Sequence, residues 1–295
     1  MKVDDPATVG HFFVPPDGFA GDGRRLVLSG DLAHHVARVL RARPGERITA
    51  CVKGERGGEG EGEAHADGRD VEYLIRLDEV GPARTTGVVE ARREAWTEPR
   101  VEVVLCQGLP KGDKMDLVVQ KAVELGVYGI IPVITSRAVP ELTPAKAASR
   151  LSRWRRVAIE AAQQSRRSRV PWVGEPATLG ELLRGVERGL ARGAGSGEAL
   201  ALWEGERRPL EAVLAGMTGD ERGRRIYLFV GPEGGFSPEE VDAFHGAGVR
   251  TAALGPRILR TETAAVAGVS VLLFYLGELG PRDPSPWISL VDATL

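Results

Sequence analysis

The chain has 295 residues, of which 42% are hydrophobic and 27% are charged, a composition typical of a globular protein with a large core. Its 39 Lys and Arg residues nearly balance its 41 Asp and Glu residues, and the formal net charge is −2. This balance excludes a protein that binds nucleic acids or membranes through its overall charge. A site for a polyanion would therefore have to be a local basic patch.

The N-terminus and the cysteines predict a soluble, cytoplasmic protein. The first residues, MKVDDPATVGHFFVPP, lack the apolar segment of a secretory signal peptide. No stretch approaches the roughly 18 to 20 apolar residues of a membrane-spanning helix, and the best candidate, residues 264–276, is too short. Cys51 and Cys106 lie in apolar, strand-like runs without metal-ligand spacing, which predicts buried free thiols in a reducing compartment.

Residues 11–95 are predicted to form a small β-barrel or sandwich domain. Alternating or β-branched runs separated by Gly and Pro indicate its strands, which read HFFVPP, RLVLSG, ERITACVKG, EYLIRLDEV and TTGVVEARRE. One helix, DLAHHVARVLR, interrupts them, with Asp31 as its predicted N-cap. Residues 54–70 are rich in Gly and acidic residues, which predicts a long mobile hairpin loop.

From residue 99 onward strands and helices alternate, which predicts a second domain, 99–282, built on a mostly parallel α/β sheet. The run VEVVLCQGL (101–109) is apolar almost throughout, as in a strand buried on both faces. Further strands are predicted at GIIPVITS, ALALWEG, IYLFVG and TAALG. Residues 185–198 are predicted to be a surface loop of this domain.

The helices of this second domain are marked by their end signals. They are predicted at 114–125, 151–165, SPEEVDAFHGAG and 262–276. Asp113 is the expected N-cap of the first helix, and Gly126 is its stop. Ser237 and Glu240 form a complete capping box at the start of SPEEVDAFHGAG.

Two similar turns occur close together, LFVGPEGGFSPE (228–239) and ALGPRILRTETAA (253–265). Each ends an apolar run at Gly-Pro and restarts as a helix, and loops that leave neighbouring parallel strands at their carboxyl ends form the crevice where open α/β sheets bind ligands. Gly234 and Gly235 have no Cβ, so their backbone can approach a ligand closely. One such loop could be a simple connection, but the pair predicts a nucleotide-like ligand. The motifs GxxxxGK[ST] and GxGxxG are absent.

These motifs together resemble the RsmE family. The segments that carry the resemblance are LFVGPEGGFSPEE, LGPRILRTETAA, KGDKMDLVVQKAVELGV, QQSRRSRVPWV and, near the N-terminus, HFFV and HHVARVLRARPGE. It covers the chain from His11 to about Gly280. The sequence departs from the family only in extra N-terminal residues, the insertion at 54–70 and a short C-terminal extension, so no motif is affected.

The resemblance implies a methyltransferase that uses S-adenosylmethionine (SAM) to methylate N3 of a uridine in the 16S rRNA of the small ribosomal subunit. It implies an α/β SPOUT domain whose C-terminal chain forms a trefoil knot, preceded by a PUA-like RNA-binding barrel. Hydrophobic periodicity alone supports only the α/β sheet. A homodimer and an assembled or nearly assembled 30S subunit as substrate are also implied.

Within this resemblance, the two Gly-Pro loops would wrap SAM, mainly through backbone groups and apolar contacts. The expected cofactor-binding residues are Gly231, Glu233, Gly235, Leu254, Gly255, Ile258, Leu259, Thr261 and Thr263. Glu233 either binds the ribose hydroxyl groups of SAM or holds its own loop in place. No metal is expected, because no Cys, Asp or Glu cluster accompanies His34 and His35.

Arg260 and Glu262 are the expected catalytic residues. The weakly acidic N3–H of uracil must lose its proton, and the planar, permanently charged Arg260 is suited to stabilise negative charge on a uracil carbonyl. The alternative for Arg260 is a salt bridge to Glu262 or to a helix end. Glu262 lies in the first turn of a helix, where the dipole favours the anion, which indicates an orienting role rather than proton abstraction.

Basic residues are expected to bind RNA. The segment 151–169 carries six Arg against one Glu, which alone would indicate a solvated charged face, but a neighbouring PUA-like domain favours phosphate binding. The expected contacts are Lys111, Lys114, Arg153, Arg156, Arg166, Arg167, Arg169, Arg38 and Arg41.

Two other functions remain open from the sequence. Another SPOUT activity, such as ribose methylation of tRNA, would use the same cofactor loops, although the LRTET segment speaks against it. A non-catalytic RNA-binding assembly factor could keep the fold, although intact Arg260 and Glu262 disfavour this. A nucleotide hydrolase is excluded for lack of a P-loop and of a credible metal site.

Overall fold

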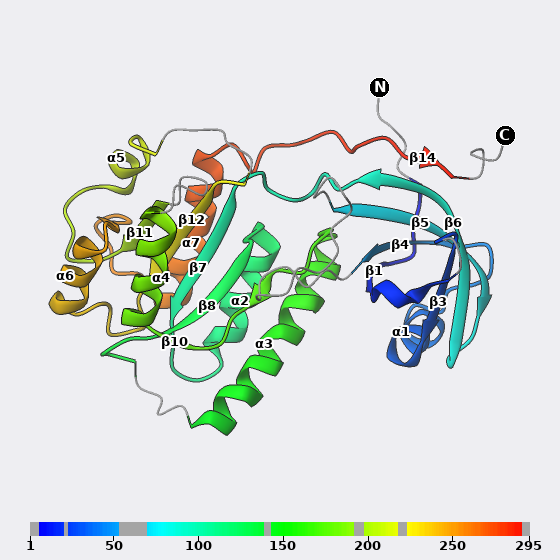
Figure 1. Cartoon of the computed structure of the whole chain (residues 1–295), viewed down its shortest axis with the longest axis horizontal. Helices are drawn as coiled ribbons and strands as arrows, with labels where there is room; N and C mark the ends of the chain where they lie inside the picture. The colour runs from blue at the N-terminus through cyan, green and yellow to red at the C-terminus, as the bar shows by residue number, and fades with distance from the viewer. Residues whose placement is uncertain are drawn as a thin grey trace. The chain divides into compact units, whose positions relative to one another are not determined.

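The computed structural model describes residues 6–20, 23–52, 70–138, 143–191, 198–217 and 223–290. Almost all of the loop predicted at 54–70 lies outside this range, as do residues 192–197 of the loop predicted at 185–198. The chain divides into two compact units (Figure 1). Unit 1 comprises Met1–Glu98, Ala162–Val170 and Arg282–Leu295, and unit 2 comprises Pro99–Ala161 and Pro171–Pro281.

Unit 1 is a half-barrel of seven strands. Its hydrogen-bonded order is β1 (His11–Val14), β4 (Arg47–Val52), β5 (Val71–Val80), β6 (Arg84–Glu94), β3 (Arg25–Ser29) and β2 (Phe19–Ala20), with β14 (Ile288–Ser289) added to β6. Only β1 and β4 pair in parallel, and the other described pairs of this sheet are antiparallel. All five predicted strand segments are present, and alternate residues along them, such as Ile75 and Leu77, are buried in the core.

The predicted helix of unit 1 begins earlier than expected. A 3-10 turn, η1 (Pro16–Gly18), precedes β2, while α1 (Gly30–His34) starts directly after β3 and continues as a π-helical turn, η2 (His35–Val39). Asp31 is therefore in the first turn of α1 and Ser29 is the N-cap residue, which corrects the prediction. Positive φ at Gly30 allows the strand to turn into the helix within one residue.

A buried ionic network attaches the segment 162–170 to unit 1. Glu72, 1% exposed, accepts hydrogen bonds from Arg93 Nε at 2.6 Å and from Ser168 Oγ. Glu98 receives the Arg167 guanidinium and the Ser168 backbone N–H, the latter at 3.0 Å. Burial alone would raise the pKa of Glu98, but the charges and hydrogen bonds of Arg167 and Arg169 together outweigh burial and lower it. This segment is therefore held by carboxylates of the half-barrel.

Removing Glu72 should destabilise unit 1 strongly. Glu72→Ala would remove the buried carboxylate that accepts from Arg93 Nε and Ser168 Oγ, and the loss of one member of a buried ion pair typically costs about 3–5 kcal/mol of unfolding free energy. Glu90→Ala is the control, because the Glu90 ion pairs with Arg47 and Arg76 involve more exposed side chains and should change stability by about 1 kcal/mol or less. Urea unfolding measures both, and equal effects of the two variants would contradict the prediction.

Unit 2 contains the predicted parallel α/β sheet. Its order is β10 (Ala177–Thr178), β8 (Gly129–Ile134), β7 (Glu102–Gly108), β12 (Arg225–Val230), β11 (Glu198–Leu202) and β13 (Arg250–Ala252), with β9 (Trp172–Val173) added to β8. Every described pair in this sheet is parallel. The carboxyl ends of β7, β12 and β11 therefore meet at one edge of the sheet, near its centre.

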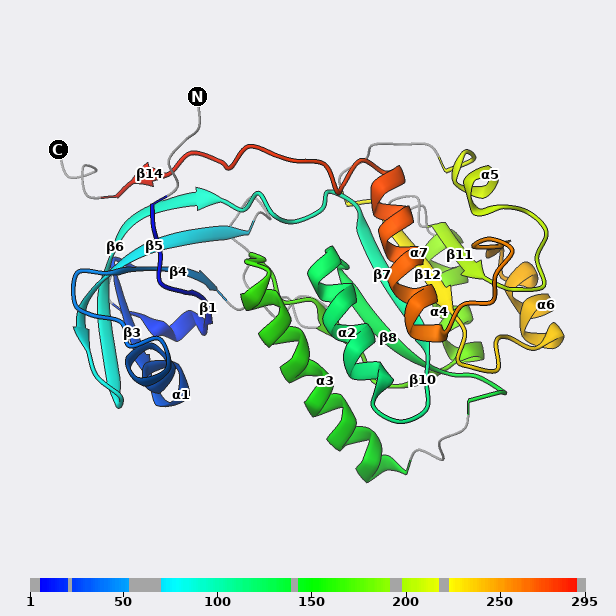
Figure 2. The ribbon, with the colours of Figure 1, turned by 180° about the vertical axis from the view of Figure 1, so that it is seen from behind.

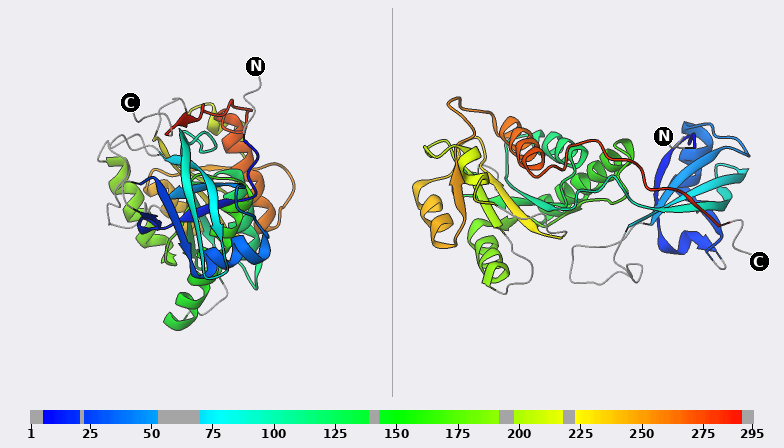
Figure 3. Two further views of the ribbon diagram at one scale, coloured as in Figure 1. Left: turned by 90° about the vertical axis from the view of Figure 1, so that its right-hand side faces the viewer. Right: turned by 90° about the horizontal axis from the view of Figure 1, so that it is seen from above.

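Helices cover both faces of this sheet, α4 and α6 on one and α2 and α7 on the other (Figures 2 and 3). The bounds are α2 (Lys114–Leu125), α3 (Pro144–Gln164), α4 (Leu179–Ala191), α5 (Leu210–Leu214), α6 (Pro238–Gly246) and α7 (Thr261–Tyr275). The prediction of a loop from 185 was wrong as far as Ala191, because Leu179, Leu183 and Val186 recur with helical spacing and are buried. The helix α3 begins at Pro144 instead of 151.

Several end signals are confirmed. Ser237 and Glu240 form the predicted capping box at the start of α6. Gly126 ends α2 in the left-handed conformation, with φ of 110°.

Cys51 and Cys106 are free and fully buried, and burial raises the pKa of both thiols well above the ordinary value. Within the described ranges, no helix has both the length and the apolar character needed to cross a membrane.

Candidate functional site

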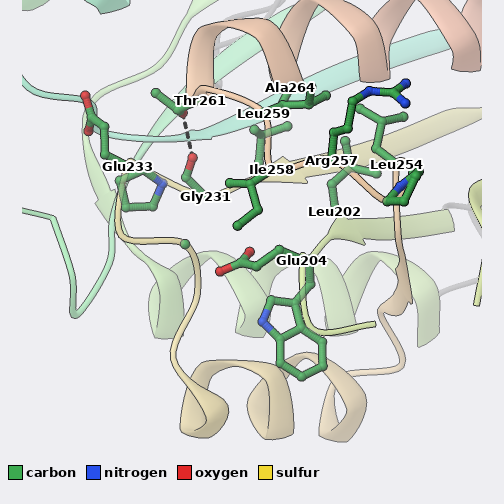
Figure 4. Close-up of a pocket in the computed structure, with 16 residues that line it drawn as sticks. Leu202, Glu204, Gly231, Glu233, Leu254, Arg257, Ile258, Leu259, Thr261 and Ala264 are labelled. Carbon is green, nitrogen blue, oxygen red and sulfur yellow. Dashed lines mark hydrogen bonds between the residues drawn. The ribbon is translucent and has the colours of Figure 1, made fainter. Parts of the chain in front are cut away.

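A cleft opens at the carboxyl edge of the unit 2 sheet (Figure 4). Three segments line it: 202–204 at the end of β11, 230–233 with 235 at the end of β12, and 254–259 with 261 and 264 after β13. The sequence predicted the second and third segments as a pair. It missed Leu202, Trp203 and Glu204. These residues reach the cleft because β11 lies between β12 and β13 in the sheet. The order of the strands, which a single sequence does not reveal, brings the segment 202–204 to the site.

Glycines allow the loops to pack closely around this cleft. Gly235 and Gly255 have positive φ values of 64° and 125°, which side-chain-bearing residues rarely adopt. A Cβ on Gly231 would lie 3.1 Å from the backbone of Gly235, and one on Gly108 would lie 2.5 Å from Pro232 Cδ. The Gly-Pro-Glu-Gly-Gly loop is thus folded against itself and against the end of β7.

Thr261 joins the two Gly-Pro loops. Its Oγ1 donates to the Gly231 carbonyl oxygen at 2.6 Å (Figure 4), and it accepts from Gln107 Nε2 at 2.9 Å. Gln107 Nε2 also donates to the Gly108 carbonyl at 2.8 Å, and the side chains of Gln107 and Thr261 are buried. Thr261 lines the cleft as predicted, but its hydroxyl is used within the protein. Thr263 is exposed and outside the residues that line the cleft.

Lys114 forms a second link between the loops. Its Nζ lies 2.7 Å from Glu233 Oε1 and 3.5 Å from Glu262 Oε2. The hydrogen bond to Glu233 raises the pKa of Lys114. Partial burial alone would raise the pKa of Glu233, but the hydrogen bonds from Lys114 and the Lys111 backbone N–H outweigh it and lower the pKa. Of the two roles left open for Glu233, this geometry supports holding its own loop.

Arg260 and Ile258 project from the second Gly-Pro loop. Arg260 is the N-cap residue of α7, exposed, and does not line the cleft. The alternative ion pair between Arg260 and Glu262 does not form among the described residues, where the cation beside Glu262 is Lys114. Ile258 lines the cleft and is 88% exposed, an unusual state for a large apolar side chain.

The predicted RNA-binding residues have different surroundings. Arg167 is buried against Glu98, Arg169 pairs with Asp70, and Lys114 pairs with Glu233 and Glu262, so these three side chains serve the fold. Arg153 pairs with Asp116 and remains about half exposed. Besides Arg153, the predicted residues that are exposed are Lys111, Arg156, Arg166, Arg38 and Arg41. No group of His, Cys, Asp or Glu in the described part of the chain is arranged to hold a metal ion.

Comparison with known proteins identifies the family. A sequence model of the RNA methyltransferase domain matches residues 97–273. Ribosomal RNA small subunit methyltransferase E of Bacillus subtilis is 30% identical over 252 residues, which cover 84% of this chain and 89% of that protein. The protein of the same name from Mycobacterium bovis is 31% identical over 87% of this chain and 88% of its own length. The chain belongs to this methyltransferase family.

Solved structures support the same assignment of this methyltransferase. The crystal structure of ribosomal RNA small subunit methyltransferase E from Neisseria gonorrhoeae, bound to SAM, is similar with a TM-score of 0.70 at 29% identity, over 90% of this chain and 97% of that one. A putative methyltransferase from Legionella pneumophila, also in complex with SAM, is similar with a TM-score of 0.67 at 27% identity, over 91% and 98% of the two chains.

Removing the Thr261 hydroxyl should destabilise this methyltransferase and release its two loops from each other. Thr261→Val leaves the buried Gln107 amide and the Gly231 carbonyl each short of a partner, which should cost about 1–3 kcal/mol of unfolding free energy. Thr263→Val changes an exposed residue two positions along α7, on the opposite side of the helix, and should change the unfolding free energy by less than about 0.5 kcal/mol. Urea unfolding measures the stability of both variants. A Thr261→Val protein as stable as the wild type would contradict the proposed role of Thr261 in joining the two loops.

Proposed function

We propose that this chain is a SAM-dependent enzyme that methylates N3 of a specific uridine in 16S rRNA, acting in the cytoplasm on the assembled 30S subunit. The observation that carries the proposal is the cleft in which Thr261 and Lys114 join the two Gly-Pro loops. The names of the relatives support rRNA of the small subunit as the substrate. The uridine N3 position and the assembled subunit rest on the resemblance of the LRTET segment.

The cleft fits a nucleoside cofactor. Leu254, Leu259 and Ile258 offer apolar surface for an adenine ring, and the exposed Ile258 would lose contact with water when the ring covers it. Gly235 and Gly255 have positive φ values and no Cβ, so a ligand in the cleft could approach their backbone closely. SAM supplies a methyl group on a sulfonium, which is activated for displacement by a nucleophilic nitrogen.

Arg260 and Glu262 are proposed to act on the uracil. The exposed guanidinium of Arg260 has no ion-pair partner among the described residues, so it is available to stabilise the anion that forms when N3 loses its proton. Glu262 is held by Lys114 and lies in the first turn of α7, which supports orientation of the substrate rather than proton abstraction.

The trefoil knot and the PUA-like character of unit 1 are part of this proposal. The path of the chain supports a knot, because β12 inserts between β7 and β11, β13 then pairs on the far side of β11, and α7 returns to pack on β7 and β12. The mixed half-barrel of unit 1 carries the exposed Arg38, Arg41 and Arg166, which are proposed to bind RNA phosphates.

A homodimer is also proposed, formed through α7. From Ala264 to Tyr275 this helix has no charged residue, and a helix that is apolar all round is normally covered. Val271, Phe274 and Tyr275 recur with helical spacing and are exposed, with Phe274 75% exposed. A second copy of the chain would cover this apolar surface.

The decisive test uses small subunits from a strain that lacks this protein. Methyl transfer from labelled SAM, followed by nucleoside mass analysis, should give N3-methyluridine at one 16S rRNA position. A ribose-methylated product would overturn this proposal in favour of ribose methylation, the related SPOUT activity. Binding of SAM without transfer to subunits, free rRNA or tRNA would favour the assembly factor.

Replacing Arg260 should affect transfer and leave cofactor binding almost intact. Arg260→Ala removes one donor that stabilises charge in the transition state, and the loss of such a donor lowers turnover by roughly 10²-fold or more. SAM affinity, measured by calorimetry, should stay near the wild-type value because Arg260 does not line the cleft. Wild-type turnover in the variant would remove Arg260 from the mechanism.

A charge on α7 should separate the proposed dimer. Phe274→Asp places a carboxylate in the apolar surface and should shift sedimentation at micromolar concentrations from dimer to monomer. Val39→Asp changes a residue of unit 1 that is 60% exposed and should leave the dimer intact. If wild-type protein sediments as a monomer, or if both variants remain dimeric, α7 is not the interface.

A further inference from the structure

Three glutamates, Glu204, Glu206 and Glu233, lie on the loops that directly follow β11 and β12, and two of them bind other groups of the protein. Glu233 accepts from Lys114 and from the Lys111 backbone N–H. Glu206 accepts from Thr251 Oγ1 at 2.5 Å and from the backbone N–H groups of two following residues, and the Thr251 hydroxyl is the largest cause of its lowered pKa. Glu204 has no hydrogen-bond or ion-pair partner among the described residues.

Glu204 is also the one of these three that faces the Gly-Pro-Glu-Gly-Gly loop across the cleft. It follows β11, lines the cleft, and its carboxylate points into the space beside Ile258 (Figure 4). The carboxylate lies so close to Gly235 that a Cβ on this glycine would be 2.2 Å from Glu204 Oε1. The glycine thus leaves room for an acidic group at the wall of the cleft.

We propose that Glu204 binds the 2′- and 3′-hydroxyl groups of the ribose of SAM, an assignment that rests on the proposed function. The two oxygens of a carboxylate are acceptors only, and the vicinal diol of a ribose presents two O–H donors with matching spacing. Dinucleotide-binding α/β folds likewise place an acidic residue for the ribose after a strand near the glycine-rich loop. Here β11, which precedes Glu204, pairs with β12, which leads into that loop.

This assignment gives the three cleft segments distinct tasks. The segment after β13 supplies apolar surface through Leu254 and Ile258, the glycine-rich loop after β12 supplies close backbone, and the segment after β11 supplies the acceptor for the ribose. Glu233, the other acidic residue considered for the ribose, would keep the glycine-rich loop closed through Lys114.

The test measures binding by calorimetry with four probes: SAM, S-adenosylhomocysteine, its 2′-deoxy analogue, and 5′-methylthioadenosine, which has the ribose and adenine but no amino-acid part. Glu204→Ala should weaken SAM, S-adenosylhomocysteine and 5′-methylthioadenosine by a similar factor of about 10 to 100. The wild type should bind the 2′-deoxy analogue about tenfold more weakly than S-adenosylhomocysteine. Glu204→Ala should bind these two ligands almost equally, because loss of the 2′-hydroxyl and loss of the Glu204 carboxylate remove the same interaction.

Two further variants complete the design. Glu204→Gln keeps the size of the side chain and one acceptor and should lose less affinity than Glu204→Ala. Glu211→Ala removes an exposed carboxylate of α5 that does not line the cleft and should bind all four probes as the wild type does. Glu204 is exposed, so the variants should unfold at the wild-type temperature without ligand.

The outcomes separate this inference from the proposed function. Unchanged affinities in Glu204→Ala would overturn the ribose assignment while SAM binding by the wild type still supports the proposed function. Loss of SAM affinity with unchanged 5′-methylthioadenosine affinity would place the methionine ammonium, not the ribose, at Glu204 and would also overturn it. Failure of the wild type to bind SAM would overturn the proposed function and this assignment together.

Discussion

The site depends on one buried hydrogen-bonded group, in which the Gln107 amide donates to Thr261 and Thr261 donates to the Gly231 carbonyl. These residues come from the end of β7, the start of α7 and the end of β12, three places far apart in the sequence. Because the group is buried, each donor and acceptor that lost its partner would remain without water, which is costly. The relative position of the two Gly-Pro loops is therefore fixed from below the cleft.

Lys114 repeats this arrangement nearer the surface. A cation between Glu233 and Glu262 connects the same two loops, and its side chain is about one third exposed. Exposed ion pairs contribute little to stability, since water screens them and the side chains lose conformational freedom. Lys114 is thus better explained as keeping the carboxylates of both loops in place than as a source of stability. The predicted contact of Lys114 with RNA stays a prediction.

Much of the fold followed from local patterns in the sequence. The capping box at Ser237 and the stop at Gly126 mark helix ends, and strand runs such as 101–109 were readable because they bury both faces. The contacts of the ranges 162–170 and 202–204 could not be predicted from local patterns. Arg167 belongs to a basic run, and only the fold brings Glu98 to it. Glu204 belongs to the site only because β11 lies between β12 and β13.

The side chains in and beside the cleft differ in whether the fold uses their polar groups. Thr261, Lys114 and Glu233 use their polar groups on one another or on the backbone, so they maintain the shape of the cleft. Arg260 and Glu204 are charged, exposed and without partners among the described residues, and neither group contributes an interaction to the folded chain. An exposed charged group stays hydrated in the folded protein, so folding does not desolvate it, and its hydrogen-bonding capacity remains for a ligand. This difference argues for assigning ligand contacts to the uncommitted groups rather than to the sequence positions nearest the glycine-rich motif.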